Sequence, residues 1–118
     1  MRGEYWSGNP GGGWRVRFIL NIRAELPGEW TAEQRQALAR QESEHAAEFM
    51  KRGILRRIFR IVGQTANFSI WDAESPEELH RLLQTLPMFP FLKITVTPVI
   101  KHPVEQLYEE KYGATPPF

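Results

Sequence analysis

Apolar side chains recur along the chain either at every second residue, as in a strand, or at every third or fourth residue, as in a helix. The order of these two patterns is the strongest constraint on the fold. Residues 14–26 alternate apolar and polar side chains, which is typical of a strand with one buried face. A segment with helical periodicity follows, and it begins with a capping box formed by Thr31 and Gln34. The predicted helix runs to about Arg52 and ends at Gly53. The first third of the chain is therefore a strand followed by a long helix.

The rest of the chain continues with strands and one more helix. The predicted segments are strands at 54–62, 66–71 and 91–100 and a helix from Ser75 to Pro87. A short turn beginning at Gly63 joins the first two of these strands into a hairpin. Ser75 is a good N-cap and is followed by proline at the first helical position.

This order of elements predicts an α+β fold, the ferredoxin-like βαββαβ sandwich, in which two helices cover one face of a four-stranded sheet. We expect one domain at residues 14–103. The glycine-rich residues 1–13 are predicted to form a flexible N-terminal arm. Residues 104–118 are predicted to form a C-terminal tail with a short helix.

A sheet with helices on one face leaves its second face open. The pattern places polar and large apolar side chains there together, namely Asn21, Arg23, Ile58, Trp71 and Lys93. A monomer would expose this apolar surface to water. We therefore predict a homo-oligomer in which another subunit covers the second face or the strand edges.

The composition excludes several classes of function. The formal charge is only +1, so the chain has no strong electrostatic field that would attract nucleic acid or an anionic membrane. The chain contains no cysteine, which excludes thiol chemistry and disulfides. Nothing in it resembles a signal-peptide core or a membrane span. We therefore expect a cytoplasmic protein.

The long predicted helix carries an ionisable pair in an unexpected place. Leu38, Glu42, His45 and Phe49 share the helix face that should be buried. If the helix is instead rotated slightly, Ala39, Ala46 and Met50 form the core stripe and Glu42 lies at its border. A partly desolvated carboxylate has a raised pKa and suits a general base, so Glu42 is the candidate catalyst and His45 a candidate substrate contact.

Two arginines supply candidate anion-binding groups. Arg56 and Arg60 are four residues apart on one predicted strand, so they share a face and lie about 13 Å apart. They form either a solvated basic face or a site in which a guanidinium binds a carboxylate substrate. The three histidines do not have the spacing of metal ligands, and no phosphate-binding loop or nucleophile motif is present. We expect no metal and no cofactor.

Five segments, taken in order and with their spacing, resemble the muconolactone Δ-isomerase family. They are NIRAELP, RQESEHAAEFMKRG, RRIFRIVGQTANFSIWD, SPEELHRLLQTLPMFPF and KHP, and they cover about residues 16–103. The resemblance implies a ferredoxin-like fold of the dimeric α+β barrel type, with dimers in which sheets face one another and, in known members, decamers. It also implies a cofactor-free isomerase of aromatic catabolism, in the β-ketoadipate pathway. Such an isomerase moves a proton within an unsaturated lactone acid, from muconolactone to the 3-oxoadipate enol-lactone.

The resemblance also assigns roles to residues of this chain. Glu42 matches the helix glutamate of the family, and Arg56 and Arg60 match its strand arginines, for the substrate carboxylate and the developing oxyanion. The implied substrate-binding residues are Asn67, which could donate an amide hydrogen bond, and Phe89 and Phe91, which could form an apolar wall.

The first strand and the hairpin turn depart from the family pattern. Ile19 and Asn21 stand where the family tends to have a histidine and a lysine, and Gln64 stands where it typically has a histidine. Asn21 and Gln64 therefore occupy substrate-site positions with different chemistry. These departures bear on the identity of the substrate.

Two alternatives remain open at the level of the sequence. One is another enzyme on a related fold, such as a cofactor-free oxygenase or a different lactone-processing enzyme. The other is a non-catalytic ligand-binding or assembly domain. An RNA-binding sheet is disfavoured because the paired stacking aromatics are missing.

Overall fold

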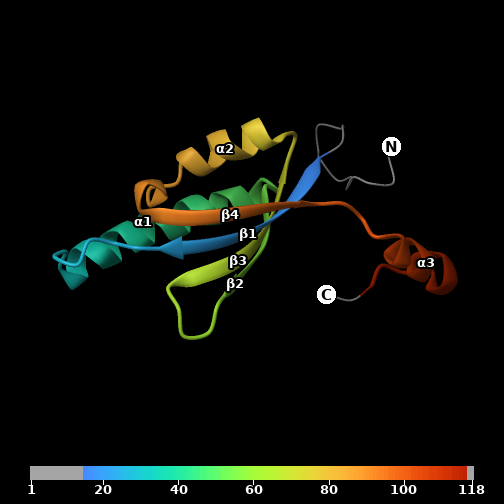
Figure 1. The fold of residues 1–118 in the computed structure, drawn as a ribbon, viewed down its shortest axis with the longest axis horizontal. Coiled ribbons are helices and arrows are strands. Elements are labelled where there is room, and N and C mark those ends of the chain that lie inside the picture. The colour runs from blue at the N-terminus through green and yellow to red at the C-terminus, as the bar shows by residue number, and fades with distance from the viewer. Residues whose placement is uncertain (1–14, 117–118) are drawn as a thin grey trace.

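The computed structural model describes residues 15–116 and has the predicted order of elements (Figure 1). The elements are β1 (Val16–Ala24), α1 (Ala32–Lys51), β2 (Leu55–Arg60), β3 (Ala66–Ala73), α2 (Pro76–Gln84), a 3-10 helix (Phe89–Phe91), β4 (Leu92–Val99) and α3 (Pro103–Tyr112). The strands form one sheet in the order β2-β3-β1-β4, and every neighbouring pair is antiparallel. The prediction of a ferredoxin-like α+β fold is confirmed. The predicted arm at residues 1–13 lies outside the described residues.

The helix boundaries follow from the capping residues that the sequence contains. Thr31 and Gln34 form the reciprocal capping box, with distances of 3.1 and 2.8 Å. Gly53, at the end of α1, has a φ of 76°, a conformation that glycine adopts without strain. The hydroxyl of Ser75 accepts a hydrogen bond from the Glu78 amide N–H at 3.1 Å and caps α2.

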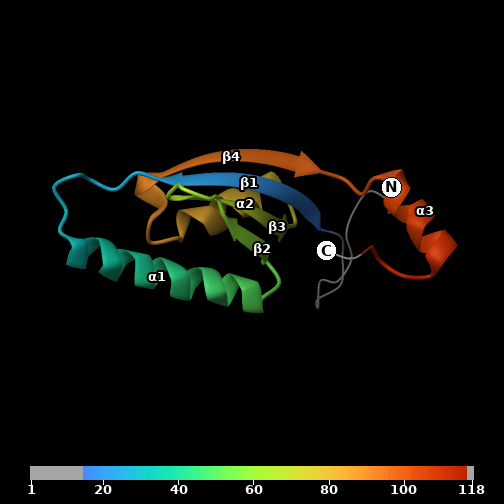
Figure 2. The same ribbon diagram turned by 90° about the horizontal axis from the view of Figure 1, so that it is seen from below.

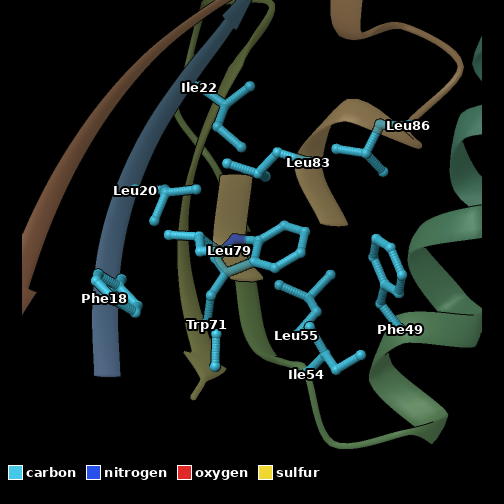
Figure 3. Close-up of a cluster of buried hydrophobic side chains, with 11 residues drawn as sticks. Phe18, Leu20, Ile22, Phe49, Ile54, Leu55, Trp71, Leu79, Leu83 and Leu86 are labelled. Atoms are coloured by element: carbon cyan, nitrogen blue, oxygen red, sulfur yellow. The ribbon is translucent and has the colours of Figure 1, made fainter. Parts of the chain in front are cut away.

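The hydrophobic core lies between the sheet and the two helices α1 and α2, which cover the same face of the sheet (Figure 2). Phe49 of α1 contacts Trp71 of β3 edge-to-face, with 5.7 Å between the ring centroids (Figure 3). Both side chains are only 2% exposed. The prediction that Trp71 lies on the open face is therefore wrong. The same prediction is wrong for Ile58, which pairs with the buried Ser69 on the face that carries Trp71. Because β3 carries apolar residues on both faces, alternation alone did not decide which face is buried.

The open face of the sheet carries different aromatic side chains from those predicted. Phe59 of β2 and Phe68 of β3 are direct partners across the strand pair and are 40% and 48% exposed. Asn21 and Arg23 of β1 are also exposed, as predicted. The sheet therefore presents an apolar centre with polar neighbours on the face away from α1 and α2.

The C-terminal helix α3 lies beyond the end of β4 and away from the sheet (Figure 1). The ammonium of Lys101 donates a hydrogen bond of 2.6 Å to the carboxylate of Glu109 and ties the helix to the segment before it. Within the described residues, no helix is both long and apolar enough to cross a membrane.

Candidate functional site

A cavity of about 470 Å³ lies between α1 and the inner face of the sheet. Phe49 is the only described residue of α1 that is fully buried, so the helix is anchored to the core near its C-terminal end. Nearer its N-terminal end, the small side chains of Ala39 and Ala46 line the cavity. Alanine methyl groups therefore form part of the helix side of the cavity wall.

Glu42 lines the cavity from the helix side. Its Oε1 atom accepts a hydrogen bond of 2.9 Å from the backbone N–H of Met88, in the segment that follows α2. Burial raises the pKa of the Glu42 carboxyl above its ordinary value, while the Met88 N–H and the nearby His45 act in the opposite direction. The carboxylate is held in place and takes up a proton more readily than an exposed one. This is the arrangement expected of a general base.

His45 lies beside Glu42 on the helix, but it is not among the residues that line the cavity. Its Nε2 atom is 2.9 Å from the Thr85 hydroxyl, and that hydroxyl donates to the Leu82 carbonyl at 2.6 Å. Because the hydroxyl proton is used, His45 is the donor to Thr85. The imidazole therefore joins α1 to the end of α2. Its role as a substrate contact stays a prediction.

The sheet contributes a cation and an amide to the same cavity. Arg60 of β2 and Asn67 of β3 are direct partners across the strand pair, and both line the cavity. Within residues 15–116, no carboxylate forms an ion pair with Arg60. The Oδ1 atom of Asn67 is buried and has no hydrogen-bond partner in the described part of the chain. A buried amide oxygen is normally paired, so a bound ligand or water would satisfy it here.

A bulge in β2 separates Arg56 from Arg60. Leu55 pairs with Trp71 and Arg57 with Ile70, so one extra residue, Arg56, is inserted in β2. The prediction that the two arginines share a face is wrong because the extra residue breaks the alternation. The Nε atom of Arg56 lies 3.9 Å from Oδ2 of the buried Asp72, and Arg56 is not among the cavity-lining residues.

The other predicted substrate contacts lie elsewhere in this single chain. Asn21 is exposed on the open face of the sheet, and Gln64, in the hairpin turn, is 3.5 Å from the guanidinium of Arg23. Phe91 packs on Trp30, with 5.1 Å between the ring centroids, and Phe89 packs against His80. None of Asn21, Gln64, Phe89 and Phe91 lines the cavity.

The structure adds polar residues that the sequence analysis missed. They are Arg35, Gln36, Ser43 and Thr65, all of which line the cavity. Arg35 donates hydrogen bonds to the carbonyls of Pro27 and Trp30, at 2.5 and 3.4 Å, so this cation has partners in the chain. The helical spacing of Arg35, Ala39, Glu42 and Ala46 was the available signal, since these residues share one face.

The described residues contain no group of three or more histidine and acidic side chains that could hold a metal ion. The groups in the cavity instead suit proton transfer on an anionic molecule. The fold and the site together define a class of protein, a ferredoxin-like α+β domain with an acid–base pocket between its first helix and its sheet.

Comparison with known proteins specifies the family. The family model described as muconolactone delta-isomerase matches residues 16–105. The chain is 38% identical over 86 residues to the muconolactone Delta-isomerase of Cupriavidus pinatubonensis, covering 73% of this chain and 94% of that protein. It is 40% identical over 88 residues to muconolactone Delta-isomerase 1 of Acinetobacter lwoffii, covering 75% and 88%.

A solved structure gives the same result. The crystal structure of muconolactone isomerase at 3.3 Å resolution matches with a TM-score of 0.69 at 33% sequence identity, over 74% of this chain and 91% of that one. The chain belongs to the muconolactone Δ-isomerase family, and it is an isomerase.

Proposed function

We propose that this isomerase shifts a proton within an unsaturated lactone carboxylate and converts muconolactone to the 3-oxoadipate enol-lactone. The observation that carries the proposal is the presence of three groups in one cavity, the desolvated carboxylate of Glu42, the guanidinium of Arg60 and the amide of Asn67. Family membership supports the reaction class. The product would enter aromatic catabolism, and we place the enzyme in the cytoplasm.

The proposed reaction begins with proton removal by Glu42. The carboxylate takes the proton from the ring carbon that bears the acidic side chain, and the electron pair moves through the double bond to the lactone carbonyl oxygen. The Asn67 amide donates a hydrogen bond to this oxygen, and Arg60 binds the side-chain carboxylate. Glu42 then returns the proton to the carbon next to the carbonyl. No atom is gained or lost, and Glu42 ends in its starting state.

The proposal is tested by following the isomerisation of muconolactone by ultraviolet absorbance in deuterated buffer. Turnover with solvent deuterium in the product and no oxygen uptake would support it. Oxygen consumption with an activated phenol would favour the oxygenase alternative. Binding of muconolactone without turnover would favour a non-catalytic domain.

Replacing Arg60 with methionine should lower kcat/KM about 10- to 100-fold, mainly through a higher KM. Methionine keeps much of the apolar stem but removes the charged hydrogen bonds to the substrate carboxylate, which contribute about 1.5–3 kcal/mol. Steady-state kinetics with Arg81→Met as the matched control checks this, since Arg81 is exposed on α2. Equal kcat/KM values for the two variants would show that Arg60 does not bind the substrate.

We also propose that the open face of the sheet is covered by a second copy of this chain, giving a homodimer and then larger assemblies. The exposed pair Phe59 and Phe68 supports this, because a monomer would leave both rings in water. Sedimentation equilibrium of the purified chain measures the assembly mass. A monomer at micromolar concentration would contradict the proposal.

A further inference from the structure

The cavity between α1 and the sheet is larger than muconolactone requires. Its volume of about 470 Å³ lies within the range of about 300–1,000 Å³ that holds drug-sized ligands. Muconolactone is a small lactone acid with one short side chain, and it would fill only part of this space. Unfilled apolar space beside a small ligand forfeits contacts on that side of the ligand.

Two of the residues of α1 that line the cavity have small side chains. Ala39 and Ala46 face the sheet across the cavity, one turn on either side of Glu42. Ala39 lines the cavity and is exposed. The free volume therefore lies directly beside the proposed base.

The remaining cavity wall is mostly apolar. The apolar wall residues, apart from the alanines, are Ile22, Leu26, Leu55, Ile58, Trp71, Leu86, Met88 and Leu92. Three charged side chains line the cavity: Glu42 and Arg35 on the helix and Arg60 on the sheet. Arg35 already donates to the carbonyls of Pro27 and Trp30, so Arg60 is the cation proposed to bind an anionic group. A fitting ligand has one anionic end and a sizeable apolar part.

We propose that the preferred substrate of this site is an unsaturated lactone carboxylate carrying an apolar substituent larger than any group in muconolactone, and that Ala39 determines this specificity. The inference rests on the proposed function, because it assigns the lactone carboxylate to the same cavity. The substituent lies against Ala39, and the acidic side chain of the substrate lies at Arg60. The proton shift itself is unchanged.

The test compares muconolactone with an analogue that carries a butyl group on the ring carbon that stays in the double bond throughout. For the wild type, kcat/KM should be at least about tenfold higher for the butyl analogue, since one methylene in an apolar pocket changes specificity about tenfold or more. Ala39→Leu should lower this ratio about tenfold by filling the space. Leucine is a good helix former, and position 39 is exposed, so the variant should fold.

Ala47→Leu is the matched control, since Ala47 is exposed on the same helix and does not line the cavity. This variant should keep the wild-type ratio. A wild type that prefers muconolactone, or an Ala39→Leu variant that keeps the wild-type ratio, would overturn the inference.

Calorimetric binding of the saturated, unreactive lactones separates this inference from the proposed function. Tighter binding of the saturated butyl lactone, weakened by Ala39→Leu, would support the specificity even if neither unsaturated lactone is isomerised, in which case the proposed function alone fails. Equal binding of the two saturated lactones to the wild type would overturn the specificity.

Discussion

Replacing Glu42 with glutamine should lower kcat for muconolactone isomerisation by about 10²–10⁴-fold, the usual contribution of a positioned general base. Glutamine keeps the size of the side chain, and its amide oxygen can still accept the hydrogen bond from the Met88 N–H. It cannot take a proton from carbon, so the loss should fall on the chemical step. Ultraviolet-monitored turnover and deuterium incorporation measure it.

Glu44→Gln is the matched control for this substitution. Glu44 lies two residues further along α1, is largely exposed, and forms only a surface pair with Arg40 at 3.3 Å. This variant should turn over at the wild-type rate. If Glu42→Gln retained more than about a tenth of wild-type kcat, another group would have to be the base.

The raised pKa of Glu42 also fixes the direction of two pH effects. Activity should fall as the pH drops through this pKa, at a higher pH than for an ordinary exposed carboxylate, because the base must be ionised. The folded state binds the proton of Glu42 more tightly than the unfolded state. Protonation of Glu42 therefore adds to the free energy of unfolding, and this contribution is fully present below the ordinary carboxyl pKa. It is lost as the pH rises through the raised value. At pH 7 the free energy of unfolding of Glu42→Gln should therefore be at least that of the wild type. The difference between the two proteins should become smaller at acidic pH. Denaturant midpoints measured over a pH series check this.

The second large effect is expected at the anchor of α1. Phe49→Ala should lower the free energy of unfolding by about 3–5 kcal/mol, because it empties the space between the helix and Trp71. Urea denaturation followed by circular dichroism measures this change.

Met50→Ala is the neighbouring control, because Met50 is 44% exposed and its truncation should change stability by about 0.5 kcal/mol or less. Similar losses for the two variants would mean that Phe49 does not anchor the helix. A loss below about 1 kcal/mol for Phe49→Ala would lead to the same conclusion.

Most of the fold could be predicted because the sequence marks its own boundaries. Thr31, Gly53 and Ser75 set the helix ends through local hydrogen bonds and backbone conformation, which do not depend on distant residues. The face of β3 could not be predicted in this way. Trp71 and Phe68 are both large and apolar, and only packing against Phe49 of α1 decides that Trp71 is the buried one.

The site residues could be predicted where the helix and the strands keep their regular periodicity. The helical period singled out Glu42, and the structure places it in the cavity with Arg60 and Asn67. The period-two pattern failed for Arg56 because a bulge leaves no simple mark in the sequence. The contact of His45 with Thr85 could not be predicted, because Thr85 is forty residues away and no sequence pattern connects the two residues.

The direct pairing of Arg60 with Asn67 across the hairpin has an evolutionary consequence. The cation and the amide belong to one hydrogen-bonded unit, whereas Glu42 belongs to a helix whose one fully buried described residue is Phe49. Substitutions along α1 can therefore change the position of the Glu42 carboxylate in the cavity, while the hairpin keeps Arg60 and Asn67 in place. New substrates can be acquired on the helix without rebuilding the sheet.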